Sequence, residues 1–252
     1  MTILGVDSSS EPMSVALAED GRIISEYYLS LGLTHSETLM CVLNEMLRQT
    51  GTDLRDIDAV AVTSGPGSFT GLRIGSGTVK GIADALDIPI IGVPTLEVMA
   101  FNIYDKDSLI VPMLDARRRN VYAGAYAYEG EELKEKLPQC ITGITELLLK
   151  IPDWGKRTVF TGDAEERFRD EIEKELKVPF SFAPPHIRNQ RAGALCVLAL
   201  KRYNAGEIMK AGDFKPDYIK ATHAEEERRE AEKQGKLKEL SEGLSILPEK
   251  GF

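Results

Sequence analysis

Apolar and polar positions along the first 105 residues follow two periods. Short apolar runs bounded by turn residues indicate strands, and apolar positions three and four residues apart indicate helices. The turn Glu19-Asp-Gly21 joins two of the strands as a hairpin. We predict strands at 2–6, 14–18, 22–29, 58–62 and 88–93, and helices at 36–49 and 71–86.

A second unit with a similar plan, but no detectable sequence repeat, begins near residue 108. We predict strands at 109–114, 121–128, 158–161 and 178–182, and helices at 144–150, 165–176 and 192–203. The pattern predicts an α/β protein of two lobes. Residues 1–105, completed by the helix near 190–205, form the N-terminal lobe, residues 106–188 form a smaller C-terminal lobe, and residues 206–252 form an extended, charged tail. Within this tail, residues 224–240 are expected to be a solvated or frayed helix.

The helix predicted at 71–86 carries unusual amounts of glycine. Each glycine inside a helix costs about 1 kcal/mol relative to alanine, so close backbone packing must compensate. At 100° per residue, one buried seam runs from Leu72 to Leu86, and small residues form a second seam almost opposite. The second seam needs a close neighbour, which is helix 36–49, a second chain, or, as we favour, both. The predicted interface residues are Leu39, Leu43, Met46, Ile74, Gly77, Thr78, Gly81 and Ala85.

Two turns are typical of phosphate binding. Asp7-Ser-Ser-Ser10 follows the first strand, and Ser64-Gly-Pro-Gly-Ser-Phe-Thr-Gly71 opens the glycine-rich helix, whose N-terminal amides favour anions. Neither is a Walker loop or a dinucleotide fingerprint. A purely structural turn is the alternative in both cases. The candidate nucleotide-binding residues are Asp7, Ser8, Ser9, Gly65, Gly67, Ser68 and Thr70.

Charge and composition narrow the class of protein. The net charge of −9 disfavours a protein that grips nucleic acid by itself, and Arg117-Arg118-Arg119 is the one basic cluster. Three scattered cysteines, no basic leader and no long apolar stretch predict a cytoplasmic protein without a membrane span.

The sequence offers no convincing catalytic constellation. Its three histidines, His35, His186 and His223, are far apart, and we expect His35 to lie near a helix cap. No serine lies in a nucleophile elbow, so neither a metalloprotease nor a serine protease is supported. We predict no metal site.

Several segments together resemble the TsaB (YeaZ) family over about the first 125 residues. They are Ile3-Leu-Gly-Val-Asp-Ser-Ser9, Gly65-Pro-Gly-Ser-Phe-Thr-Gly-Leu-Arg-Ile-Gly75, Gly92-Val-Pro-Thr-Leu96 and Asp115-Ala-Arg117. The resemblance implies an actin-like (ASKHA, ribonuclease H-like) fold and a role in making N6-threonylcarbamoyladenosine in tRNA. In that pathway a TsaC-type enzyme makes the adenylate, a TsaD-type subunit transfers the group, and a TsaE-type ATPase joins TsaB and TsaD.

The same resemblance separates this chain from its catalytic paralogues. TsaD-like subunits carry a His-x-x-x-His metal pair, and the matching positions here are Thr95 and Met99. A hydroxyl and a thioether do not replace two imidazoles on iron or zinc. We therefore expect an accessory subunit that binds TsaD-like and TsaE-like proteins, or itself, and that meets tRNA only through the complex.

Two questions about ligands stay open at this point. This chain is expected to require no cofactor, although ATP or ADP at the interface of the complex is compatible with it. The alternative function is an ATP-dependent phosphotransferase or ATPase acting alone. For Asp115, Arg117 and Arg118 the alternatives are contact with tRNA and pairing near the lobe junction, with Arg117 bound to Asp115 or another acid.

Overall fold

A computed structural model describes residues 1–219 of the 252 residues. The strands are β1 (Thr2–Asp7), β2 (Met13–Glu19), β3 (Arg22–Leu29), β4 (Ala59–Gly65), β5 (Ile90–Pro94), β6 (Ser108–Asp115), β7 (Asn120–Glu129), β8 (Glu132–Gly143), β9 (Arg157–Thr161) and β10 (Phe180–Phe182). The α-helices are α1 (His35–Thr50), α2 (Phe69–Leu86), α3 (Thr95–Phe101), α4 (Ile144–Lys150), α5 (Ala164–Glu175) and α6 (Ala192–Asn204). Two short 3₁₀ helices cover Leu54–Asp56 and Ile151–Trp154.

The strands form two sheets of the same topology. The first sheet has the order β3-β2-β1-β4-β5, and the second has the order β8-β7-β6-β9-β10. In each sheet, an antiparallel meander of three strands is extended by two parallel strands, which the intervening helices connect. This repeated βββαβαβ plan is that of the actin-like fold, as the sequence predicts.

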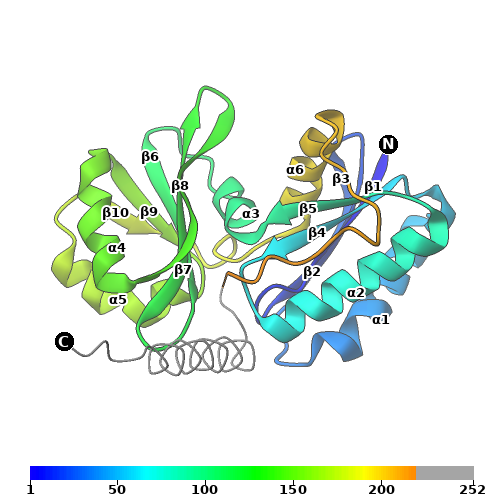
Figure 1. Cartoon of the computed structure of the whole chain (residues 1–252), viewed down its shortest axis with the longest axis horizontal. Coiled ribbons are helices and arrows are strands. Elements are labelled where there is room, and N and C mark those ends of the chain that lie inside the picture. Colours follow the sequence, from blue (N-terminus) through cyan, green and yellow to red (C-terminus); the bar gives the residue numbers. More distant parts are fainter. Residues whose placement is uncertain (220–252) are drawn as a thin grey trace, which may run out of the picture. The chain divides into compact units, whose positions relative to one another are not determined.

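Helices cover both faces of the first sheet (Figure 1). Leu4 and Val6 of β1 face a core made with α1 and α2, whereas Ile3 faces a second core made with α6. Because both faces are buried, β1 is apolar from Ile3 to Val6 and β4 from Ala59 to Val62. Gly5 permits close approach of α6, since a Cβ there would lie 2.6 Å from Cys196 Sγ.

The short helix α3 connects the cores of the two sheets. Val98 belongs to the core shared with α6, while Leu96 and Met99 belong to a core on the second sheet. The opposite face of the second sheet packs against α4 and α5. Hydrophobic packing around α3 therefore connects the two sheets.

The sequence misses two regular elements. The strand β8 was not predicted because its residues are charged and include Pro138, which suits its place at the edge of a sheet. The helix α3 has only 7 residues and lacks a full amphipathic repeat. All of the predicted strands and helices are present, with ends shifted by at most three residues.

The predicted start of the tail at residue 206 is wrong for residues 206–217. Met209 forms an antiparallel bridge with Ile90, and Phe214 is only 1% exposed within the core shared with α1 and α2. This segment is therefore part of the packed body that ends at Asp217. The charged segment 224–240 lies outside the described residues. None of the helices within residues 1–219 has the length and hydrophobicity needed to cross a bilayer.

Candidate functional site

The two phosphate-type turns meet at the carboxyl ends of β1 and β4. Ser68 N–H donates to the Ser9 carbonyl at 2.6 Å, and the Ser8 hydroxyl donates to the Gly71 carbonyl at 2.8 Å. A Cβ at Gly67 would lie 2.1 Å from Ser9 O, and one at Gly71 would lie 2.0 Å from Ser8 O. The backbone segments are thus in direct contact, and only glycine fits at these positions.

The inner face of α2 is the face that packs on the serine turn. Gly75 on this face extends the contact by one helical turn beyond Gly71. A Cβ there would lie 2.4 Å from Ser8 Oγ. Gly71 and Gly75 are four residues apart on one face of α2, and Gly67, two residues before the helix, contacts the same turn. His35, at the start of α1, lies on the same turn, with Nε2 2.8 Å from Ser10 O.

Asp7 is fully buried beneath the turn. Its Oδ1 accepts hydrogen bonds from Ser9 N–H at 2.9 Å and from the Ser9 hydroxyl at 2.7 Å. Oδ2 has no hydrogen-bond partner among the described residues, as is also true of the nearby Thr63 Oγ1 and Gln190 Oε1. Burial raises the pKa of Asp7 to about 6, and the bonds from Ser9 offset only part of that effect.

The segment 206–217 lies over the start of α2. Asp217 N–H donates to Ser64 O at 2.6 Å, and a Cβ at Gly65 would lie 2.3 Å from Asp217 O. Lys80 holds the same segment by donating to Phe214 O at 2.9 Å.

These contacts decide whether the predicted nucleotide-type residues fit a phosphate group. A methyl group at Gly67, Gly71 or Gly65 would overlap Ser9, Ser8 or Asp217, so there is no room for a phosphate on the side of the turn that faces these residues. The serine turn is occupied by the chain's own backbone, and Asp7 has no exposed surface. Ser68 is the N-cap of α2, accepting from Gly71 N–H at 3.3 Å, and Thr70 is exposed on the first turn. The predicted residues therefore pack on one another, and the serine turn and the start of α2 do not enclose a phosphate of ATP between them.

The outer face of α2 is open. Gly77, Gly81 and Ala85 are exposed, whereas Ile74 and Thr78 are partly exposed. No atom within residues 1–219 comes within 4 Å of a Cβ built at Gly77 or Gly81. The helix α1 is therefore not the close neighbour that we expected for this seam.

The predicted interface on α1 is wrong in detail. Leu39, Leu43 and Met46 are each at most 1% exposed, because they are the residues with which α1 packs on the first sheet. They are unavailable to a partner in this conformation. The apolar residue that α1 does present is Met40, which is 47% exposed, and Leu31 and Leu33 are exposed just before the helix.

The positions that match the metal-binding histidine pair lie on α3. Thr95 and Met99 are both fully buried, and Met99 packs in the core of the second sheet. Within residues 1–219, no group of three or more histidine, cysteine, aspartate or glutamate side chains is arranged to hold a metal ion.

The loop between β6 and β7 has a strained backbone. Arg117, Arg118 and Arg119 have φ values of 63°, 51° and 64°, in the left-handed region that costs about 1–2 kcal/mol per residue with an L side chain. Asp115 Oδ1 accepts the N–H of Arg117 at 2.9 Å, while its other oxygen pairs with the guanidinium of Arg167. The expected bond between Asp115 and Arg117 thus uses the Arg117 backbone rather than its side chain.

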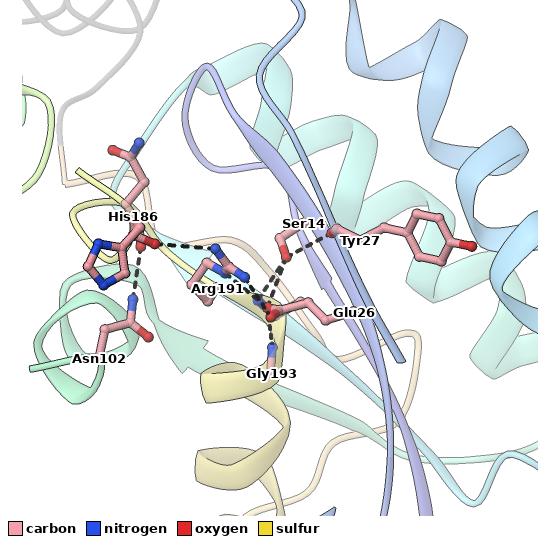
Figure 2. Close-up of polar contacts among 9 residues, drawn as sticks. Ser14, Glu26, Tyr27, Asn102, His186, Arg191 and Gly193 are labelled. Carbon is pink, nitrogen blue, oxygen red and sulfur yellow. Dashed lines mark hydrogen bonds and ion pairs between the residues drawn. The ribbon is translucent and has the colours of Figure 1, made fainter. Parts of the chain in front are cut away.

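A cavity of about 500 Å³ that the sequence did not reveal lies beside the start of α6. Figure 2 shows the polar contacts among residues of this region. Glu26 of β3 pairs with Arg191 at 3.0 Å and accepts Gly193 N–H at 2.9 Å, and Ser14 Oγ accepts Ala192 N–H at 3.0 Å. These bonds satisfy the first amides of α6, so the charged groups serve the fold. The lining residues are Ile23, Glu26, Asn102, His186, Ile187, Arg191, Gly193, Ala194 and Val197.

No local signal could have found this cavity. Its residues come from β3, the end of α3 and the start of α6, and no motif links them. The Arg191 guanidinium also stacks over the Tyr28 ring, with Cζ 4.9 Å from the ring centroid.

Comparisons with known proteins lead to proteins named for tRNA threonylcarbamoyladenosine formation and to YeaZ. Residues 31–228 match the sequence model of TsaD, tRNA N6-adenosine threonylcarbamoyltransferase. The chain is 31% identical to the tRNA threonylcarbamoyladenosine biosynthesis protein TsaB of Bacillus subtilis over 92% of this chain and 100% of that protein. It is 37% identical to the TsaB protein of Escherichia coli over 54% of this chain and 62% of that protein.

A solved structure shows the same fold. It is a Pseudomonas aeruginosa protein described as similar to peptidase YeaZ, with a TM-score of 0.76 and 26% identity. The superposition covers 87% of this chain and 99% of the other. On the full-length match to the Bacillus subtilis protein and this structural likeness, the chain belongs to the TsaB (YeaZ) family.

Proposed function

We propose that this chain is a non-catalytic partner subunit of a TsaD-type transferase in the formation of N6-threonylcarbamoyladenosine in tRNA. In this proposal the outer face of α2, with the exposed part of α1, binds the TsaD-type subunit. A TsaE-type ATPase joins the pair, and tRNA meets this chain only in the complex. A homodimer through the same face is the alternative assembly when the partner is absent.

The observation that carries the proposal is the open seam of α2. Gly77 and Gly81 cost the helix about 2 kcal/mol in total relative to alanine, and no contact within residues 1–219 compensates for that cost. Small residues at this spacing let another helix approach closely. The exposed Met40 on the neighbouring α1 adds apolar surface, as expected of a protein interface rather than of a solvated face.

The assignment as a non-catalytic subunit rests on chemistry. By the resemblance, Thr95 and Met99 correspond to the metal-binding histidines of TsaD-like subunits; both are fully buried, and Met99 packs in a hydrophobic core. A partner must then supply the metal centre. The relatives' role in tRNA threonylcarbamoyladenosine biosynthesis supports a TsaD-type protein as that partner.

The alternative function, an ATPase acting alone, requires an open phosphate site. The contacts of Gly67 and Gly71 with the serine turn argue against it. We expect calorimetry of the purified chain with ATP and Mg²⁺ to show no binding at micromolar concentrations. Binding together with turnover by this chain alone would favour the ATPase. Whether ATP or ADP binds at the interface of the complex is tested by the same titration on the complex.

The test of the interface uses bulky substitutions at the open glycines. Gly77→Trp and Gly81→Trp place a side chain in empty space, so each variant should remain folded while no longer forming the complex. Gly143→Trp is the matched control, because it also has no atom of the described chain within 4 Å of its Cβ but lies at the start of α4. Size-exclusion chromatography with the TsaD-like protein of the same cell measures complex formation.

A modification assay on unmodified tRNA completes the experiment. We expect modification with the wild-type chain and with Gly143→Trp, and loss of modification with both α2 variants. An intact complex with Gly77→Trp and Gly81→Trp would refute the proposed interface. Full modification in the absence of this chain would refute the proposed function.

A further inference from the structure

The loop between β6 and β7 places arginine where the backbone favours glycine or asparagine. Three consecutive residues, Arg117 to Arg119, have positive φ angles. The turn is held from several sides: Ala116 N–H donates to Asn120 O, Asn120 N–H donates to Arg117 O, and Ile144 N–H donates to Arg119 O. Glycine would adopt this shape without strain, so the arginine side chains need a reason to be there.

Only one of the three side chains has a partner within residues 1–219. Arg119 donates to both carboxylate oxygens of Glu171 at 2.8 Å. Arg117 and Arg118 are exposed, and no ion pair is formed by either guanidinium in this part of the chain. The neighbouring acids are already engaged: Asp115 binds Arg167 and the Arg117 amide, and Asp163 accepts the Asp115 N–H.

We infer that Arg117 and Arg118 bind phosphate groups of the RNA backbone when tRNA is held by the complex with the TsaD-type subunit. The planar guanidinium fork matches a phosphate in geometry and stays charged at every physiological pH. The inference rests on the proposed function, because the chain as a whole is acidic and would not hold tRNA by two arginines alone.

A nucleotide is a poorer occupant for these arginines than RNA. The serine turn and the start of α2 are in backbone contact at Gly67 and Gly71, so they enclose no space between them for the phosphates of a nucleotide. An RNA backbone needs no such enclosure. It is bound by exposed cations on a rigid loop, which is the arrangement that the bonds from Asn120 and Ile144 maintain.

The experiment measures the affinity of the assembled complex for unmodified tRNA at a series of salt concentrations. We expect the double charge reversal Arg117→Glu with Arg118→Glu to weaken binding about tenfold at low salt. It should also reduce the slope of log affinity against log salt by about two, one for each phosphate that is no longer bound. The matched control is Arg22→Glu with Arg55→Glu, which changes the charge equally at exposed arginines paired with Glu19 and Asp53. The control should leave affinity and slope near those of the wild type.

A second variant separates charge from strain. Arg118→Gly removes one cation and relieves one strained residue, so we expect a higher melting temperature of the chain together with a slope reduced by about one. A lower melting temperature would contradict the argument from strain, and with it the inference.

The remaining outcomes distinguish the inference from the proposed function. A complex that forms and modifies tRNA, but binds it unchanged after the double charge reversal, would overturn the inference alone. Loss of the protein complex itself on charge reversal would also overturn it, by making the loop a protein contact. Failure of the wild-type chain to form the complex would refute the proposed function on which the inference rests.

Discussion

Alanine substitutions at the glycines of α2 should change the stability of the chain in opposite directions on the two faces of the helix. Gly77 and Gly81 have open space at the Cβ position, so alanine there should only gain helix propensity. At about 1 kcal/mol per site, Gly77→Ala with Gly81→Ala should stabilise the isolated chain by about 2 kcal/mol. For a chain of this length, that gain raises the melting temperature by about 4–8 °C.

Gly71→Ala on the inner face should act in the other direction. Its Cβ would lie 2.0 Å from the backbone oxygen of Ser8, which cannot move without shifting β1. Separating the segments also lengthens the hydrogen bond from the Ser8 hydroxyl to Gly71 O. Overpacking costs about 1–3 kcal/mol and a weakened hydrogen bond about 1 kcal/mol, against a propensity gain of about 1 kcal/mol. The net expectation is a loss of about 1–3 kcal/mol.

Thermal and urea unfolding of the isolated chain, at two protein concentrations, measures these effects. The alanine pair on the outer face should at the same time weaken the complex with the TsaD-type subunit, because two methyl groups enter a closely packed interface. Stability of the chain and affinity for the partner then change in opposite directions. A lower melting temperature for Gly77→Ala would refute the claim that this face of α2 is unpacked in the isolated chain. If the melting temperature also depended on protein concentration, the result would favour a homodimer packed on this face.

Three further predictions follow from the packed body. Burial holds the pKa of Asp7 at about 6, above its value of 3.8 in the unfolded chain, so stability falls as pH rises between these values. Asp7→Asn should remove this decrease in the free energy of unfolding and stabilise the chain by about 2–3 kcal/mol at pH 7. An unchanged pH profile of unfolding would contradict this prediction. Phe214→Ala should cost about 3–5 kcal/mol in unfolding free energy and expose residues 206–217 to proteolysis, whereas a surface-like effect below about 1 kcal/mol would show that the segment is not packed. Glu26→Ala should destabilise the chain by about 1–3 kcal/mol through the missing cap of α6 and the unpaired Arg191, and Glu26→Gln, which keeps an acceptor for Gly193 N–H, should cost less in the same unfolding measurement.

Periodicity predicted the inner face of α2 because its signal is unambiguous. Leu72, Val79 and Ile82 recur at helical spacing, and all three are buried against the first sheet. The stripe on α1 is wider than one sheet can cover, and spacing alone does not say which part of it is buried. For that reason Leu39 and Leu43 were assigned to an interface, while Met40 is the residue left exposed.

Other features depend on contacts between distant segments, which no local pattern encodes. Phe214 is surrounded in sequence by polar residues, yet it packs on Gly92, where a Cβ would lie 2.9 Å from its ring. The same holds for Glu26, which caps a helix that begins more than 160 residues later. The left-handed conformation of the arginines also could not be predicted, since glycine and asparagine are the residues that signal it.

The glycines near the start of α2 and those in its middle lie in different surroundings. Gly67, just before the helix, and Gly71 and Gly75 within it bring α2 very close to the serine turn. The Ser8 hydroxyl donates to Gly71 O, and Ser9 O accepts the Ser68 N–H. That contact leaves no space between the turn and the helix, and it packs the helix on the end of β1. In the proposed complex, a helix that is already packed in place would lose little conformational entropy when a partner binds at Gly77 and Gly81. In that complex, the contact that packs the serine turn on α2 would also hold the outer face of that helix in place for the partner.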